Sequence, residues 1–341
     1  MGKTLKKLTR KSEFYTFLII VVLAIAIEIA SGQFFTANNF VDILSAMIVP
    51  GLFAIGEFMV LISGGIDVSF PAAASLTIYA TTKYLLDINY EGGIFLPLIM
   101  VIVLGAILGA FNGFLIGYMN LTPMIVTLGA SSVFKGVMQG ALDSKQLAVI
   151  PSGMKKFGVD GLFTTYNSAT GLTSKMPLTF IIFIIALILA YIVLNYTYFG
   201  RGIYAIGGNP QSARCAGYKV EKTKFLVYVI SGAIAGVGGL CRTCVMQQCH
   251  PTNMLGMEMN VIAGVVLGGT AITGGSGSLA GCFLGTLLIV MVENSMIMLG
   301  IPTTWKNVFT GALIVIGVGI SAMQVKRAEK AAELARKERA L

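Results

Sequence analysis

The chain has little of what an enzyme or a soluble domain needs. Charged residues make up 11% of its 341 positions and the only histidine is His250, whereas soluble domains carry about a quarter of charged residues. No Ser/His/Asp set is recognisable around that single histidine. No G-x-x-x-x-G-K-[S/T] segment is present either, so the chain cannot hydrolyse ATP through a phosphate-binding loop. We therefore predict that it is not an enzyme and binds no cofactor.

What the chain has instead is long apolar runs. Hydrophobic residues make up 56% of the sequence and the mean hydropathy is +0.84, and a helix of about 20 apolar residues crosses the hydrocarbon core of a bilayer. The sequence predicts an all-α polytopic membrane protein with one membrane domain, residues 14–323. Eight predicted spans are 14–31, 42–63, 95–118, 121–138, 177–196, 223–240, 278–298 and 303–323, and two shorter ones, 68–83 and 257–272, bring the expected number to about ten.

Basic residues predict the orientation of these helices. Lys and Arg are retained on the cytoplasmic side, and they gather in residues 3–11, 197–224 and 326–339. Both termini are therefore expected in the cytoplasm, with 324–341 as a charged tail, and the number of spans must be even. Ten spans place 197–224 inside and 143–175 outside; eight do so only if both shorter segments are re-entrant. The net charge of +9 then reflects topology, and we expect no nucleic-acid partner.

Glycines mark two kinds of position. They recur every four residues from 105 to 117 and from 277 to 285, a pattern that lets helix backbones pack closely in lipid. Two Gly–Gly steps, Gly64–Gly65 and Gly268–Gly269, interrupt apolar segments because glycine is costly inside a helix. Each step precedes a helix rich in small residues, which suggests an internal repeat of the kind found in transporters. Both steps are expected near the cytoplasmic face, where ordinary turns would also explain them.

Few ionisable or amide side chains lie inside the predicted spans. Each is costly in hydrocarbon and is expected to face the bundle interior or water. Glu57 and Glu293 are the first candidates for lining a pathway, whereas Asp67 is better explained as a cap of the next helix through Ser69 and the local amides. The full set is Glu28, Glu57, Asp67, Asn112, Glu258, Asn260, Glu293 and Asn294.

The cysteines near the only histidine leave three readings open. Cys241, Cys244 and Cys249, with His250 adjacent, begin with a Cys-x2-Cys spacing that is found in zinc sites. Against zinc, Cys241 ends a predicted helix and Arg242 lies between two of the thiols. A disulfide at the outer face and unpaired thiols are the other readings. We expect no metal here.

Four segments occur in the order in which they are found in a known family. They are LISGGIDVS (61–69), LTPMIVTLGASSVFKG (121–136), FGRGIYAIGGNPQSARCAGYKV (199–220) and IAGVVLGGTAITGGSGSLAGCFLG (262–285). Over residues 40–325 the chain resembles the permease subunits of ATP-binding-cassette importers for ribose, galactose, xylose and related solutes. The resemblance implies two permease subunits, copies or paralogues, in a bacterial inner membrane. Cytoplasmic ATPases would drive them, and an extracytoplasmic binding protein would deliver a sugar.

The resemblance also assigns the 197–224 loop as the element that couples the permease to the ATPase. Residues 209–217 would form a short docking helix, with Asn209 as its N-cap, Pro210 at its first position and a left-handed turn at Gly217. Where family members carry an Ala–Ala pair, this chain has Ser212–Ala213, and Cys215 is a second departure. The residues expected to couple are Asn209, Pro210, Gln211, Ser212, Ala213, Arg214 and Gly217.

The expected translocation path carries polar groups that suit a neutral, hydroxyl-rich solute. Its predicted residues are Glu57, Asp67, Asn112, Glu258 and Asn294. Related permeases also import nucleosides, an autoinducer-type furanose or branched-chain amino acids, although the GGIDVS segment fits the sugar branch better. The competing class is a secondary carrier driven by an ion gradient, in which Glu57 or Glu293 would serve as the proton or cation site.

Overall fold

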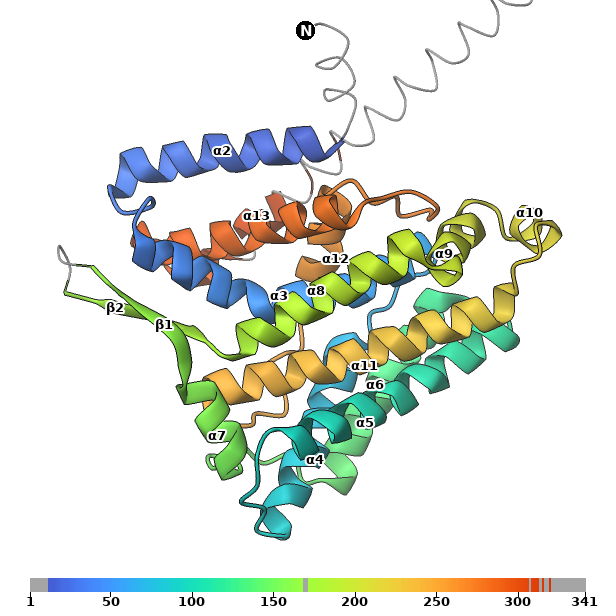
Figure 1. Cartoon of the computed structure of the whole chain (residues 1–341), viewed down its shortest axis with the longest axis horizontal. Helices are drawn as coiled ribbons and strands as arrows, with labels where there is room; N and C mark the ends of the chain where they lie inside the picture. Colours follow the sequence, from blue (N-terminus) through green and yellow to red (C-terminus); the bar gives the residue numbers. More distant parts are fainter. Residues whose placement is uncertain (1–11, 168–170, 307, 313–314, 316–318, 320–341) are drawn as a thin grey trace, which may run out of the picture.

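The computed structural model describes residues 12–167, 171–306, 308–312, 315 and 319, and these are mostly helical (Figure 1). The long helices lie roughly side by side. In chain order the elements are α2 (Ser12–Ser31), α3 (Ala37–Ile62), α4 (Phe70–Asp87), α5 (Phe95–Gly113), the π-helix η1 (Phe114–Tyr118), α6 (Pro123–Ala141), α7 (Ser152–Val159), β1 (Gly161–Tyr166), β2 (Thr173–Pro177), α8 (Thr179–Tyr196), α9 (Tyr198–Gly208), α10 (Pro210–Cys215), α11 (Val220–Met246), α12 (Glu258–Leu267), α13 (Leu279–Met298) and the 3-10 turn η2 (Thr303–Trp305).

Six helices of the described chain are long and apolar enough to cross a membrane. They are α2, α3, the continuous α5–η1 helix, α8, α11 and α13, and they coincide with six of the eight stronger predicted spans. The predicted span 121–138 is also a helix, α6, but it is not among these six. About half of the predicted span 303–323 and the whole charged tail 324–341 lie outside the described residues.

The two shorter predicted spans are helices as well. The first is α4, which packs against α5, α6 and α11 and has 13 of its 18 residues buried. A helix enclosed by other helices does not need an apolar face toward lipid, so α4 can carry the buried hydroxyls of Ser75, Thr77, Thr81 and Thr82. This enclosure explains why the segment looked too polar and too short from hydropathy. The second, α12, has ten residues and packs against α13 and α3.

Glycines bring two pairs of helices into backbone contact, as their spacing predicted. A Cβ added at Gly109 of α5 would overlap the carbonyl oxygen of Tyr228 on α11, and one added at Gly105 would overlap that of Gly232. In the same way, a Cβ at Gly285 of α13 would overlap the carbonyl of Gly264 on α12. Larger side chains would force these helices apart.

Both Gly–Gly steps end a helix with the same backbone turn. The N–H groups of the first three residues after α3 donate to carbonyls four, three and five positions earlier, and those after α12 repeat this pattern. Gly64 and Gly269 hold the left-handed position, with φ of +84° and +92°. This is the Schellman ending, which favours glycine because a Cβ is strained there. The same turn also ends α4, α10 and α13, so the predicted internal repeat stays a prediction.

The two ends of the helices carry different structures (Figure 1). One end carries α9 and α10. The other carries α7 and a hairpin in which β1 pairs antiparallel with β2. The hairpin corrects the all-α prediction. It lies within the polar segment 143–175 that was expected outside the membrane, and its threonines and aromatic residues favour strands.

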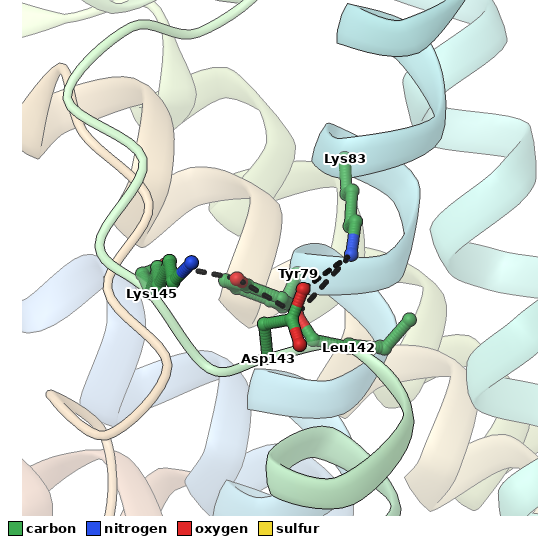
Figure 2. A network of polar contacts seen from close by, with 5 residues as sticks. All are labelled: Tyr79, Lys83, Leu142, Asp143 and Lys145. Atoms are coloured by element: carbon green, nitrogen blue, oxygen red, sulfur yellow. Dashed lines mark hydrogen bonds and ion pairs between the residues drawn. The ribbon is translucent and has the colours of Figure 1, made fainter.

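The C-terminal half of α4 holds the loop that follows α6, as Figure 2 shows. The Tyr79 hydroxyl lies 2.9 Å from the carbonyl oxygen of Lys145 and 3.2 Å from that of Leu142. Lys83 Nζ donates to the Leu142 carbonyl at 3.3 Å and lies 3.8 Å from Asp143. The buried helix α4 is therefore fixed at this end by a polar network, and its other end lies at the Gly64–Gly65 step.

Candidate coupling element and buried polar centre

Two short helices project at one end of the long ones (Figure 1). The first, α9, begins behind Thr197, whose Oγ1 accepts a hydrogen bond from the Gly200 N–H at 3.0 Å. The Thr197 hydroxyl also donates to the Val193 carbonyl at 2.5 Å, which joins the start of α9 to the end of α8. Asn209 separates α9 from α10. The coupling segment predicted from sequence is thus a pair of helices, of which α10 lies farther from the bundle.

The predicted caps of α10 are confirmed. Asn209 Oδ1 accepts hydrogen bonds from the N–H groups of Gln211 and Ser212, both at 2.9 Å, and Pro210 holds the first helical position. At the other end Gly217 has φ of +89°, and the Tyr218 N–H donates to the carbonyl five positions earlier at 3.1 Å. Both ends of this six-residue helix are therefore fixed by residues of the chain itself.

The helix α10 has one attached face and one free face. Ala213 is 3% exposed and packs in a small cluster with Ile206 of α9 and Val220 of α11. Ser212 and Arg214 are exposed. The departure from the family's Ala–Ala pair therefore falls on the solvent side, where a hydroxyl costs nothing. The free face is polar and basic, as a surface that binds a soluble partner would be.

The attachment of α10 is reinforced by aromatic and charged contacts. Tyr198 and Tyr218 stack with their ring centroids 4.6 Å apart, and the Tyr198 hydroxyl donates to the Gly217 carbonyl at 3.2 Å. Arg214 forms an ion pair with Glu221 at the start of α11. These contacts connect α10 to both α9 and α11, so a displacement of α10 carries its neighbours with it.

Three of the five predicted path residues meet in a buried cluster between α3, α4 and α5. Glu57 of α3 is fully buried, and its Oε1 accepts a hydrogen bond from the Asp67 N–H at 3.3 Å. Asp67 Oδ1 accepts from the N–H of Ser69 at 2.7 Å and from its hydroxyl at 2.6 Å. Asn112 of α5 donates from Nδ2 to Ser69 Oγ at 2.8 Å. We call Glu57, Asp67, Ser69 and Asn112 the polar centre.

The predicted capping role of Asp67 is wrong, because Ser69 is the N-cap residue of α4 and its side chain makes no capping hydrogen bond. The Asp67 carboxylate does bind Ser69, as expected, but it accepts no hydrogen bond from the amides of the first helical turn. Asp67 therefore shapes the residues that lead into α4. Because its own N–H is held by Glu57, this segment is fixed from both sides.

Two residues that the sequence did not single out border the polar centre. Thr127 of α6 accepts a hydrogen bond from the Val68 N–H at 3.3 Å. The Tyr228 hydroxyl of α11 lies against Gly65, where an added Cβ would be 2.5 Å away. Among the described residues, Glu57 Oε2, Asn112 Oδ1 and the Tyr228 hydroxyl have no hydrogen-bond partner. Unpaired buried polar groups such as these gain most from a new hydrogen-bond partner.

The other two predicted path residues lie elsewhere. Glu258 stands at the start of α12 and accepts a hydrogen bond from the Gly256 N–H at 2.9 Å. Asn294 of α13 donates to Asn39 Oδ1 at 3.3 Å. Within the described chain no hydrogen bond joins either of them to the polar centre, and their place along a path stays a prediction.

Glu293 is an ordinary paired carboxylate. Its Oε1 accepts a hydrogen bond from Asn260 Nδ2 at 2.9 Å, and its Oε2 lies 2.9 Å from Lys306 Nζ. With an amide and a lysine already bound to it, this group is poorly suited to serve as the cation site of a secondary carrier.

All five cysteines are free thiols. Cys241 and Cys244 are buried in α11, and Cys249 lies beyond the end of that helix. Burial raises the pKa of the Cys249 thiol to about 11. The described residues hold no group of three or more potential metal ligands.

Long apolar helices with a few polar side chains turned inward define a polytopic helical membrane protein. Residues 39–318 match the family described as the permease component of a branched-chain amino acid transport system, and the chain belongs to this family. It is a multi-pass membrane permease of a bacterial importer of the ATP-binding-cassette type, and it is not an enzyme. The family resemblance inferred from the sequence is confirmed.

Curated relatives align over most of their length. The chain is 31% identical over 310 residues to the D-allose transport system permease protein of Escherichia coli (strain K12), covering 90% of each chain. It is 30% identical over 308 residues to the ribose import permease protein of Bacillus subtilis (strain 168), covering 89% of this chain and 90% of the relative. It is 26% identical to the xylose transport system permease protein of E. coli (strain K12), covering 91% of each. No solved structure matches the chain significantly.

Proposed function

We propose that this chain forms the membrane pathway of a monosaccharide importer together with a second permease subunit, either another copy or a paralogue. An ATPase encoded separately would dock on α10, and an extracytoplasmic binding protein would deliver the sugar at the opposite end. The observation that carries the proposal is α10 itself, a helix capped at both ends whose polar face is free at one end of the bundle. Its position fits an element through which a soluble motor acts on helices in a membrane.

The solute class follows from relatives and from the polar centre together. The relatives described above are named for D-allose, ribose and xylose. The polar centre offers carboxyl, hydroxyl and amide groups, which can bind a neutral sugar in several orientations. Asn112 and Glu57 have oxygen atoms still available for this purpose.

A second candidate solute is an autoinducer-type furanose, which is also hydroxyl-rich. The chain is 28% identical to the autoinducer 2 import system permease protein of Salmonella choleraesuis (strain SC-B67). Uptake of labelled D-allose, D-ribose, D-xylose and autoinducer 2 by proteoliposomes of the complete importer distinguishes these solutes.

We further propose a ten-span topology in which α4 and α12 are the short spans and residues from 303 onward supply the tenth. This arrangement places α10 in the cytoplasm with its basic residues, in keeping with the retention of Lys and Arg on that side. It places α7 and the β-hairpin outside. Cysteine labelling at Arg214 and at Lys156, with a reagent that does not cross the membrane, tests the assignment from each side.

The docking role of α10 is tested by changing its free face. In the double variant Gln211→Glu and Ser212→Trp, both at exposed positions, we expect the ATPase to be lost on co-purification and ATP-driven uptake to fall by about a hundredfold, as for hot-spot residues of interfaces. Lys156→Glu on α7, an exposed change at the opposite end, is the control and should leave ATPase binding intact.

Two results would contradict the proposal. If the ATPase remains bound after deletion of residues 209–217, α10 is not the coupling element. If uptake persists in vesicles that lack the ATPase but carry a proton gradient, the chain is a secondary carrier.

A further inference from the structure

The C-terminal end of α9 touches both the end of α3 and the connector that precedes α13. A Cβ added at Gly207 would overlap the Ile62 carbonyl oxygen and lie 2.5 Å from the Gly275 nitrogen. Side chains do not approach backbone atoms this closely, so only glycine fits at this position. At the neighbouring Gly208, in contrast, an added Cβ has no atom within 4 Å. Two adjacent glycines of one helix thus face different surroundings.

The end of α3 and the connector before α13 are also in direct contact with each other. The Gly275 N–H donates to the Ile62 carbonyl at 2.8 Å, across more than 200 residues of sequence. A Cβ added at Gly274 would lie 2.7 Å from Gly64 Cα. We call the group Ile62, Gly64, Gly207, Gly274 and Gly275 the glycine joint. It consists of three segments in backbone contact without intervening side chains.

A further hydrogen bond holds α9 in the glycine joint. The hydroxyl of Tyr204, less than one turn before Gly207, donates to the Gly277 carbonyl at 3.2 Å. The side of α9 that faces the connector before α13 is therefore bound both through its backbone and through a side chain.

The glycine joint leads directly into the polar centre. Gly64 is followed by Gly65, which lies against the Tyr228 hydroxyl, and then by Asp67 and Ser69. Backbone atoms in contact cannot be compressed, so a shift of α9 must move the Gly64 backbone or break the contact. Because Asp67 is only three residues beyond Gly64, such a shift reaches the polar centre within one short connector.

We propose that Gly207 is a positioning residue for transport. It seats α9 against the connectors 63–69 and 268–278 at once, so that a displacement of α10 moves both and rearranges the polar centre. This inference rests on the proposed function, since it requires an ATPase that displaces α10. It assigns to Gly207 a role distinct from docking: Gly207 transmits the movement, whereas the free face of α10 receives it.

The matched pair Gly207→Ala and Gly208→Ala tests the inference in the complete importer in proteoliposomes. Both variants should retain the ATPase on co-purification, because α10 is unchanged. With D-allose, D-ribose and D-xylose as probes, Gly207→Ala should lower the sugar imported per ATP hydrolysed by about tenfold, whereas Gly208→Ala should stay within about twofold of the unmodified importer. An unchanged ratio for Gly207→Ala overturns the inference and leaves the proposed function standing. Loss of the ATPase from Gly207→Ala alone would make Gly207 a docking residue and also overturn it.

A measurement without substitutions covers the case in which Gly207→Ala fails to fold. Hydrogen exchange is followed in the unmodified importer with and without a non-hydrolysable ATP analogue. We expect altered exchange in the peptide that contains Gly275, whose amide binds the Ile62 carbonyl. No change is expected at Cys249, whose amide donates to the Leu147 carbonyl at 3.0 Å in the loops beyond the far ends of α6 and α11. If exchange slows in α10 but does not change at Gly275, the inference about Gly207 is wrong and the proposed function still stands. If exchange changes in neither place, both the inference and the proposed function are wrong.

Discussion

The two connectors that follow the Gly–Gly steps begin alike and then differ. Residues 63–69 and 268–278 both start with the Schellman ending described above. In the first connector, five of seven residues are buried, and side chains accept hydrogen bonds from several of its backbone N–H groups. In the second connector, two of eleven residues are buried. The second connector instead has Gly274, Gly275 and Gly277 at positive φ.

The difference indicates a division of roles between the two connectors. Hydrogen bonds accepted by Glu57 and Asp67 and donated by Asn112 hold the first connector in one conformation, as a site that must present polar groups requires. The second connector depends on glycine, which allows many backbone conformations. A displacement of α9 therefore acts on two connectors, of which the first is stiff and the second is compliant. We expect substitutions to affect the two unequally.

The largest effect is expected from Asp67→Ala in the first connector. The change removes the acceptor for the N–H and the hydroxyl of Ser69, both buried. Leaving two buried donors without an acceptor should cost about 3 kcal/mol of unfolding free energy. The measurements are the thermal midpoint of the purified importer and ATP-driven sugar uptake, and both should fall.

Asp67→Asn is the control, because its side-chain oxygen can still accept from Ser69. It should retain most of the stability. If Asp67→Ala is as stable as the unmodified protein, the first connector is not held by its side chains and the contrast with the second fails.

The local parts of this comparison could be predicted from the sequence, and the long-range parts could not. The caps of α10 depend on residues within a few positions of each other, so Asn209, Pro210 and Gly217 could be assigned from their order alone. The overlap between Gly207 and Gly275 depends on segments far apart in the chain, and no local pattern distinguishes Gly207 from Gly208. Tyr228 looked like any aromatic residue of an apolar helix.

Hydropathy likewise reports only how apolar a segment is. It located α2, α8 and α13 because these helices are mostly apolar, and it left α4 uncertain because that helix carries several buried hydroxyl side chains. The same limit applies to the path residues. Glu57, Asp67 and Asn112 were selected for their cost in hydrocarbon, and burial brought them together; Glu258 and Asn294 met the same criterion but bind at other places.

The second-largest effect is expected from substitutions of the left-handed glycine that each connector contains. Gly64→Ala and Gly269→Ala each place a Cβ at positive φ, which should cost about 1 kcal/mol in both cases. The nearest atom to a Cβ at Gly64 is 3.7 Å away, so the cost there is backbone strain and not a clash. Because both substitutions meet the same kind of backbone strain, the thermal midpoints of the two variants should fall by a similar amount.

Sugar uptake, in contrast, should differ between Gly64→Ala and Gly269→Ala. Gly64→Ala strains the connector that carries the polar centre and should reduce transport more than Gly269→Ala does. Gly129→Ala in α6, where an added Cβ meets no atom within 4 Å, is the control and should raise the midpoint slightly because alanine favours helix. A greater loss of transport in Gly269→Ala would reverse the proposed division of roles.

The smallest effect is expected from Ser278→Ala at the end of the second connector. Ser278 Oγ caps α13 by accepting from the Gly281 N–H at 2.9 Å, and it also binds Glu13 of α2. Because the serine is only half-buried, water can replace the lost oxygen, and we expect a cost of about 0.5 kcal/mol, at the low end for an N-cap. Ser278→Thr keeps the hydroxyl and should restore the thermal midpoint, while uptake should remain unchanged in both variants. A loss of uptake as large as that of Asp67→Ala would show that the second connector, too, is positioned by its side chains, and the compliance that we assign to it would then have to lie elsewhere in the fold.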